Sequence, residues 1–155
     1  MTPLDFGTDL VRAHTTEKVY GRAEAIVAAE DILRLVRRGD RLEAAVQGSD
    51  VRPYRVRVPL TARGVGDPRC TCPYSFGGWC KHVAAVMLSA IEMPHSIEVE
   101  PPLDEIIEAQ TEAGVKAALL ALAEAHPEMA DEIEARVQGL EYEPPEWDLG
   151  DDYGW

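Results

Sequence analysis

The chain has 155 residues, enough for one globular domain with a small appendage, and its 46% of hydrophobic residues can build a core. No apolar run approaches the roughly eighteen residues of a membrane-spanning helix, and the N-terminus lacks the basic and apolar regions of a secretory signal. A formal net charge of −13 repels nucleic acid on average, so the distribution of charge matters more than the total.

The N-terminal part begins with an expected irregular or weakly helical lead-in over residues 1–20. The following segment, residues 22–38, allows two interpretations. Its alanine content and its apolar spacing would allow a helix. The turn signal Gly39-Asp40 favours a β-hairpin instead, because apolar residues lie on both sides of it. These residues are Ile32, Leu35 and Val36 before the turn, and Leu42, Ala44 and Val46 after it.

A further strand is predicted for residues 54–58, after a second turn at residues 48–50. Apolar residues alternate there with Arg55 and Arg57, which gives the strand one apolar and one basic face. Pro59 ends this strand, and residues 61–69 form a loop rich in Gly and Pro. We therefore expect an antiparallel sheet of three or more strands before the cysteines.

After residue 82 the period of the pattern changes to that of a helix, with apolar residues at Val83, Val86, Met87, Ala90 and Ile91. Pro94 ends this helix, and residues 95–102 are expected to be a linker. Residues 103–139 again favour helices, with Pro127 in the first turn of the second one and Gly139 as a stop. The acidic and aromatic end is expected to be mobile unless something binds it.

All three cysteines lie in one short segment, CTCPYSFGGWCKH, at residues 70–82. An odd number of closely spaced cysteines is a poor disulfide framework and suits a metal in a reducing compartment, so we expect a cytoplasmic protein. Cys70 and Cys72 place two thiolates on one side of an extended segment. A loop with two glycines then returns the chain to Cys80 and His82. Four such ligands fill the tetrahedral shell of one structural Zn²⁺ and leave no position open for catalysis.

The spacing C-x-C-x7-C-x-H resembles the pattern of the SWIM zinc-finger family, C-x-C-x(n)-C-x-H. The flanks agree, since AAVQGSDVRPYRVRV resembles the strand region before this finger and CKHVAAVML resembles its closing helix. The resemblance covers about residues 32–92. It implies one zinc ion held by Cys70, Cys72, Cys80 and His82. His95 could replace His82, but His82 has the family spacing.

The resemblance implies a module that binds DNA or another protein, and it implies no reaction. The family's finger is found in Swi/Snf-type ATPases, Mu-type transposases and other larger proteins. This chain has no phosphate-binding loop of the G-x-x-x-x-G-K-[ST] type and no G-x-S-x-G motif, so it looks like a small stand-alone SWIM protein.

The centre of the chain is basic and the two ends are acidic. Residues 31–82 hold ten Lys or Arg and five acids, a charge of +5, whereas the other residues carry −18. Arginine and lysine bind phosphates without sequence preference, and an aromatic residue can stack on bases. We therefore expect nucleic acid, DNA more than RNA, to contact Arg52, Arg55, Arg57, Arg63, Arg69, Lys81 and Trp79. The alternative is that these arginines solvate a small sheet and that Trp79 packs under the finger.

A second hypothesis is an adaptor that binds a protein partner through the acidic C-terminal half, without contacting nucleic acid. Trp147, Tyr153 and Trp155 lie among acids in the tail, which could also fold back on the basic face and compete with nucleic acid. An enzyme is the least expected class. His14 and His126 are isolated, and no pair of carboxylates has a positioned partner. We expect no small-molecule substrate and no membrane association.

The sequence thus predicts an α+β protein. A small antiparallel sheet is closed by the zinc finger and by a helix from about residue 80 to 92, and a C-terminal helical hairpin follows. The expected organisation is a lead-in at 1–20, a strand-rich SWIM zinc-finger domain at 21–94, a helical region at 103–139 and an acidic aromatic tail at 140–155.

Overall fold

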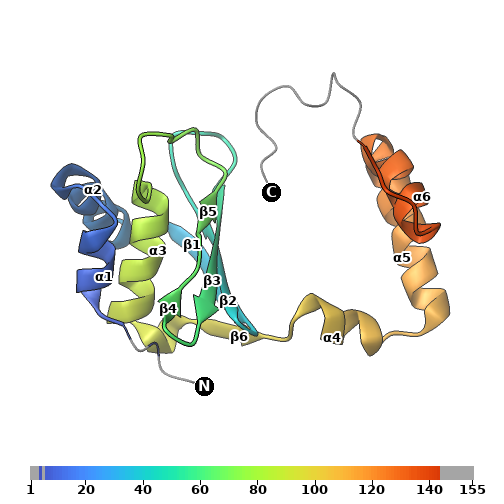
Figure 1. The fold of residues 1–155 in the computed structure, drawn as a ribbon, viewed down its shortest axis with the longest axis horizontal. Coiled ribbons are helices and arrows are strands. Elements are labelled where there is room, and N and C mark those ends of the chain that lie inside the picture. Colours follow the sequence, from blue (N-terminus) through green and yellow to red (C-terminus); the bar gives the residue numbers. More distant parts are fainter. Residues whose placement is uncertain (1–3, 5, 144–155) are drawn as a thin grey trace. The chain divides into compact units, whose positions relative to one another are not determined.

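The computed structural model describes residue 4 and residues 6–143 (Figure 1). These residues form two compact units, which meet in sequence between Pro101 and Pro102. In the part of the chain that is described, no helix is both long and apolar enough to cross a membrane.

The first unit is built on a mixed sheet in the order β4-β3-β2-β1-β6, with β5 also paired to β3. The strands are β1 (Ile32–Arg38), β2 (Arg41–Val46), β3 (Tyr54–Thr61), β4 (Gly64–Val65), β5 (Arg69–Cys70) and β6 (Glu98–Glu100). All pairs among β1 to β5 are antiparallel, as predicted, but β6 pairs with β1 in parallel. The expected linker over residues 95–102 therefore contains a strand, which reaches the sheet by a crossover through the preceding helix.

The hairpin predicted around Gly39 is confirmed, because β1 pairs with β2 across that turn. Gly39 has a φ of 57°, a left-handed conformation that glycine adopts without a steric cost. Both interpretations of residues 22–38 hold in part. Helix α2 (Glu17–Ala28) occupies the first half of this segment, and β1 occupies the second.

The N-terminal residues are more ordered than the predicted lead-in. Helix α1 (Thr8–Ala13) is followed directly by α2, whose N-cap Thr16 accepts a hydrogen bond from the Val19 amide at 3.3 Å. Val11 is fully buried and Tyr20 is 5% exposed, so both helices contribute to the core. The structure therefore confirms the helical alternative for most of the segment predicted as an irregular or weakly helical lead-in, and it includes this segment in the folded unit.

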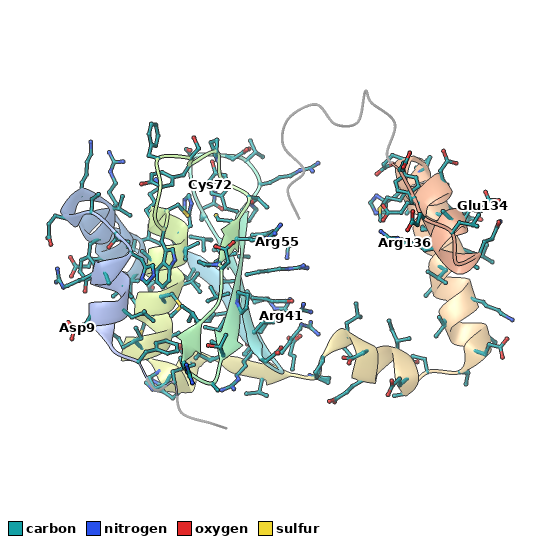
Figure 2. All side chains as sticks on the ribbon, viewed as in Figure 1. Asp9, Arg41, Arg55, Cys72, Glu134 and Arg136 are labelled. Atoms are coloured by element: carbon teal, nitrogen blue, oxygen red, sulfur yellow. The ribbon has the colours of Figure 1, made fainter. Side chains whose placement is uncertain are left out.

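Helix α3 (Lys81–Glu92) lies at the centre of the first unit, between the sheet and helices α1 and α2 (Figure 1). It spans the predicted region of about 80–92, and nine of its twelve residues are buried. Inward residues of the sheet, among them Leu42, Val56 and Val58, complete this core. The helices cover one face of the sheet, and long side chains such as those of Arg41 and Arg55 project from the other face (Figure 2).

The second unit contains the predicted C-terminal helices. They are α4 (Leu103–Glu108), α5 (Glu112–Ala125) and α6 (Ala130–Val137), with a 3-10 turn, η2 (Pro127–Met129), before α6. Helices α5 and α6 contact each other as the expected hairpin. Gly139 follows α6 with a φ of 71°, as predicted for a helix stop. Most of the predicted tail, including Trp147, Tyr153 and Trp155, lies outside the described residues.

Candidate metal centre and basic sheet face

Four predicted metal ligands come together where the sheet meets the start of α3. Cys70 ends β5, Cys72 lies two residues further on, and Cys80 and His82 lie at the N-terminus of α3. Their ligand atoms all lie within 4.8 Å of one another. His82 Nδ1 is 3.8 Å from Cys70 Sγ and 4.0 Å from Cys80 Sγ. Ligand atoms of a tetrahedral zinc site are separated by about 3.6–3.8 Å, so this cluster can hold one zinc ion with small adjustments.

The loop between the two halves of the cluster is shaped by glycines and by a contact with α1. Gly77 and Gly78 have φ values of 81° and 69°, which reverse the chain. The Trp79 amide then donates to the His14 carbonyl at 2.8 Å. The Trp79 indole stacks on the His14 ring with centroids 4.4 Å apart. These two contacts hold Trp79, the residue immediately before Cys80, in place.

The surroundings of His82 fit a metal ligand. The residue is 3% exposed, and its Nε2 atom has no hydrogen-bond partner among the described residues. Its Nδ1 atom faces the cysteine sulfurs, while the Tyr54 ring packs against the imidazole at 4.5 Å. Burying an imidazole with so few partners costs about 1–3 kcal/mol. Coordination through Nδ1 would leave Nε2 unpaired, but the free energy of zinc binding, about 10–16 kcal/mol in small fingers, exceeds that cost.

The three thiols influence one another strongly. The Cys70 thiol and then the Cys80 thiol lower the pKa of Cys72 by hydrogen bonding to its thiolate. The same bond with Cys72, then the bond with Cys80 and burial, raises the pKa of Cys70. For Cys80, the bond with Cys70 lowers the pKa, but the bond with Cys72 and burial outweigh it, and the pKa is raised. One thiolate is thus favoured, and ionisation of the other two thiols is disfavoured. A zinc ion binds cysteines as thiolates, and its positive charge would stabilise all three of them together.

The predicted nucleic-acid contacts are spread over several places. Arg55 and Arg57 are exposed on β3, and Arg69 on β5 pairs in register with Arg57. Arg52 and Arg63 are exposed in the turns before and after β3, and Lys81 is half-buried at the start of α3.

Trp79 is the exception among the predicted contacts, because it is only 7% exposed beneath His14. A base cannot stack on a ring that is already covered. This burial removes Trp79 from the predicted contact surface and agrees with the alternative that it packs under the finger. The exposed aromatic residue of the loop is Phe76, at 87%, and Tyr74 contacts it edge-on at 5.5 Å.

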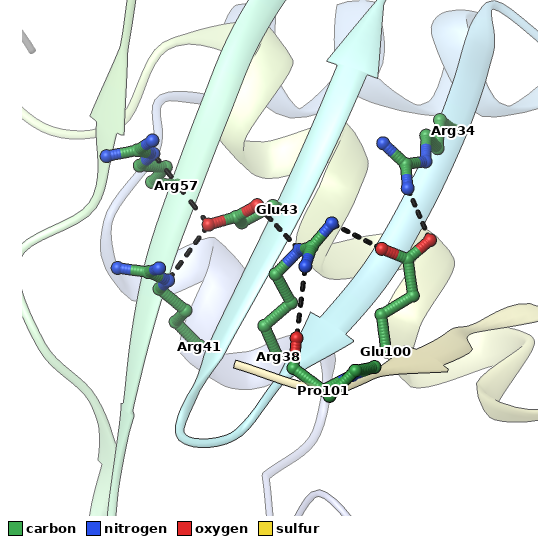
Figure 3. Close-up of polar contacts among 7 residues, drawn as sticks. All are labelled: Arg34, Arg38, Arg41, Glu43, Arg57, Glu100 and Pro101. Carbon is green, nitrogen blue, oxygen red and sulfur yellow. Dashed lines mark hydrogen bonds and ion pairs between the residues drawn. The ribbon is translucent and has the colours of Figure 1, made fainter. Parts of the chain in front are cut away.

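The outer face of the sheet also carries an ion-pair network that the sequence did not reveal (Figure 3). Glu43 on β2 lies 2.9 Å from Arg41, 3.3 Å from Arg38 and 3.9 Å from Arg57. Glu100 on β6 pairs with both Arg34 and Arg38, and Arg38 also donates to the Pro101 carbonyl at 3.0 Å. The sequence does show that Arg41, Glu43 and Ala45 alternate with apolar residues in β2, which places an acid beside a cation on one face of the strand. The partners across the strands were not apparent from it.

Residues 54–91 match the family model of the SWIM zinc finger. The matched segment runs from β3 to α3 and includes all four clustered ligands. Comparison with curated proteins and with solved structures gave no match.

Proposed function

We propose that this protein, with a SWIM zinc finger at residues 54–91, binds nucleic acid through the outer face of its sheet. The carrying observation is the excess of arginine on that face. By strand register, six arginines share it with three acids, Glu43, Glu98 and Glu100. The arginines are Arg34, Arg38, Arg41, Arg55, Arg57 and Arg69. A net positive face on a chain of net charge −13 is suited to phosphate contacts.

In this proposal the zinc ion is structural and the protein is not an enzyme. The cluster offers four protein ligands, which complete a tetrahedral shell and leave no position for a reacting water. Cys70 directly follows Arg69, and β5 pairs with β3 beside Arg57. Zinc would therefore hold the basic strands against the start of α3.

Two features support single-stranded over duplex nucleic acid as the partner. Phe76 is 87% exposed in the zinc loop, where an unpaired base could stack on it. The Tyr74 hydroxyl donates to the Gly77 carbonyl at 3.2 Å, which holds the edge-on neighbour of Phe76 in place. Single-strand binding surfaces usually combine aromatic residues on which bases stack with cationic residues that contact the backbone.

The test is binding of the zinc-loaded protein to labelled single- and double-stranded DNA and RNA over a salt series. A variant with Arg55, Arg57 and Arg69 replaced by glutamine should lose most of the salt-sensitive affinity. The matched control replaces Lys18, Arg22 and Lys116, three exposed cations on α2 and α5, and so changes the net charge equally. Equal losses in both variants, or no binding by the unaltered protein at low salt, would refute the proposal.

A second candidate function, protein docking, is favoured by helix α5. Between residues 113 and 125 only Lys116 and Glu124 are charged, and a helix that is apolar on all sides is normally buried. Yet none of the described side chains of the second unit is buried, and Leu120 is 67% exposed. Residues 102–143 hold eleven acids and two bases, so we propose a basic amphipathic helix as the partner.

A synthetic helix with leucine on one face and lysine on the other is a suitable probe for this docking function. Leu120→Gln should weaken its binding, measured by fluorescence anisotropy, whereas Leu33→Gln should not. Leu33 is a matched control because it is 56% exposed on β1. Binding that is equal for both variants, or equal for a leucine–glutamate helix, would argue against docking on α5.

A further inference from the structure

The central strand β2 presents three residues to the outer face, Arg41, Glu43 and Ala45. Register places a residue of β1 and a residue of β3 on either side of each. Glu43 is flanked by Val36 and Arg57, and Ala45 is flanked by Arg34 and Arg55. Strands β1 and β3, which flank β2, are about 10 Å apart, because neighbouring strands are separated by about 4.8 Å.

Glu43 shows what an anion does at this position. Its two carboxylate oxygens contact the guanidinium groups of Arg38, Arg41 and Arg57, which come from three different strands (Figure 3). A single negative charge on β2 thus gathers arginines across the sheet. One step further along the same strand, the corresponding position holds an alanine.

A hollow of about 220 Å³ lies over this position. Arg34, Arg55 and Arg57 line it, together with the small side chain of Ala45 and with Val36, which is 1% exposed. Glu43 also lines the hollow, but its charge is offset by the three arginines that it contacts.

Two of the arginines around the hollow retain donors for a ligand. The Arg55 side chain makes no hydrogen bond or ion pair with any described residue. Arg34 uses one guanidinium nitrogen for Glu100, and a guanidinium has five N–H donors. The hollow is therefore cationic on two opposite sides, and the strand position between Arg34 and Arg55 is Ala45, which carries no charge.

We propose that this hollow binds one phosphate group of the nucleic-acid backbone, with Arg34 and Arg55 donating from opposite sides. The inference rests on the proposed function and locates its main phosphate contact. Guanidinium groups suit the planar, two-oxygen contact that a phosphate offers. Arg57 and Arg69 continue the row of cations from Arg55, which favours a polyanion over a single carboxylate.

The experiment fills the hollow with an acid. In Ala45→Glu the new carboxylate should pair with Arg34 and Arg55 as Glu43 pairs with its neighbours, so the melting temperature should not fall. The matched control is Thr61→Glu, which adds the same charge to the same face of β3. Thr61 is six residues from Arg55, about 20 Å along the strand and well beyond the screening length of about 8 Å at physiological salt.

Binding is measured with a labelled oligothymidine of about a dozen nucleotides over a salt series. Ala45→Glu should weaken binding about tenfold or more, which is the effect of losing one charge-assisted contact. It should also reduce the slope of log K against log salt by about 0.7, the value for one phosphate of a single strand. Thr61→Glu should change neither quantity appreciably.

The outcomes separate this inference from the proposed function. If the unaltered protein binds and both variants weaken binding equally, the hollow is not the phosphate site, although the basic face still binds. If no nucleic acid binds at all, the proposed function fails. The melting temperature is then measured with added pyrophosphate, to test whether the hollow binds phosphate groups. Pyrophosphate that raises the melting temperature of the unaltered protein, but not of Ala45→Glu, supports a phosphate site for another ligand. No rise in either protein overturns the inference.

Discussion

Cys72→Ser tests the central claim about the metal. Cys72 lies in the loop after β5, half-buried, outside the fully buried core. A serine hydroxyl occupies nearly the same space but does not ionise to a zinc ligand near neutral pH. The substitution therefore removes one of four ligands while leaving the packing of the sheet and α3 almost unchanged.

The expected effect is large. Structural zinc contributes about 10–16 kcal/mol in small fingers near neutral pH, and a whole domain is stable by about 5–15 kcal/mol. The first unit ends at Pro101, and in a domain of about 100 residues each kcal/mol of lost stability lowers the melting temperature by about 4–8 °C. Losing only about 4 kcal/mol of the zinc contribution would then lower the melting temperature by about 16–32 °C.

The assay combines metal analysis with calorimetry on the full chain. The unaltered protein should contain one zinc per chain, and Cys72→Ser should contain none and melt at a much lower temperature or without a cooperative transition. Ser75→Ala, an exposed change in the same loop, is the control and should behave like the unaltered protein. A Cys72→Ser protein that keeps one zinc and melts within a few degrees of the control would show that the ligand set is wrong.

Three further substitutions test individual contacts. A Cβ at Gly48 would lie 2.3 Å from the Tyr54 ring and 3.3 Å from His82 Nε2, so Gly48→Ala should cost about 1–3 kcal/mol and speed zinc loss to a chelator. Chelator kinetics equal to those of the unaltered protein would contradict this. His14→Ala removes the ring stacked on Trp79 and should cost about 0.5–1.5 kcal/mol and shift tryptophan fluorescence to the red. An unshifted spectrum would show that the stack does not shield the indole. The hydrogen bond from Arg34 lowers the pKa of Glu100, so its stabilisation is present at neutral pH and lost as pH falls through that lowered value. Glu100→Gln should therefore lower the melting temperature at neutral pH but not in strong acid, and a difference that persists in acid would rule out the ion pair as its cause.

Features of the fold that depend on neighbours in the sequence could be predicted. The β1–β2 hairpin followed from alternation around Gly39, and α3 followed from helical spacing after residue 82. The four clustered ligands followed from spacing, because C-x-C and C-x-H each place two donors at one end of a short element. In each case the residues that form the pattern lie in one short continuous segment of the sequence.

Features that depend on distant partners could not be predicted. Trp79 is covered by His14, which lies far away in sequence, so nothing local to the zinc loop indicated that its indole was buried. Strand β6 has only three residues, too few for the alternation of Glu98, Val99 and Glu100 to predict a strand, and it is held by pairing with β1 and by the bonds of Glu100 to Arg34 and Arg38. Tertiary contacts of this kind override local propensity.

The zinc cluster and the basic face are linked by strand register. Cys70 pairs with Val56, and Arg69 pairs with Arg57, so the strand that supplies the first ligand is bonded to the strand that carries the arginines. The Thr71 hydroxyl, between the two cysteines, accepts a hydrogen bond from the Arg55 amide at 2.9 Å, and the Thr71 amide donates back to the Arg55 carbonyl at 3.0 Å. A metal that holds residues 70–72 in place therefore also holds the backbone beneath Arg55. For this reason a structural zinc ion can determine how the arginines are presented to the proposed nucleic-acid ligand without contacting that ligand itself.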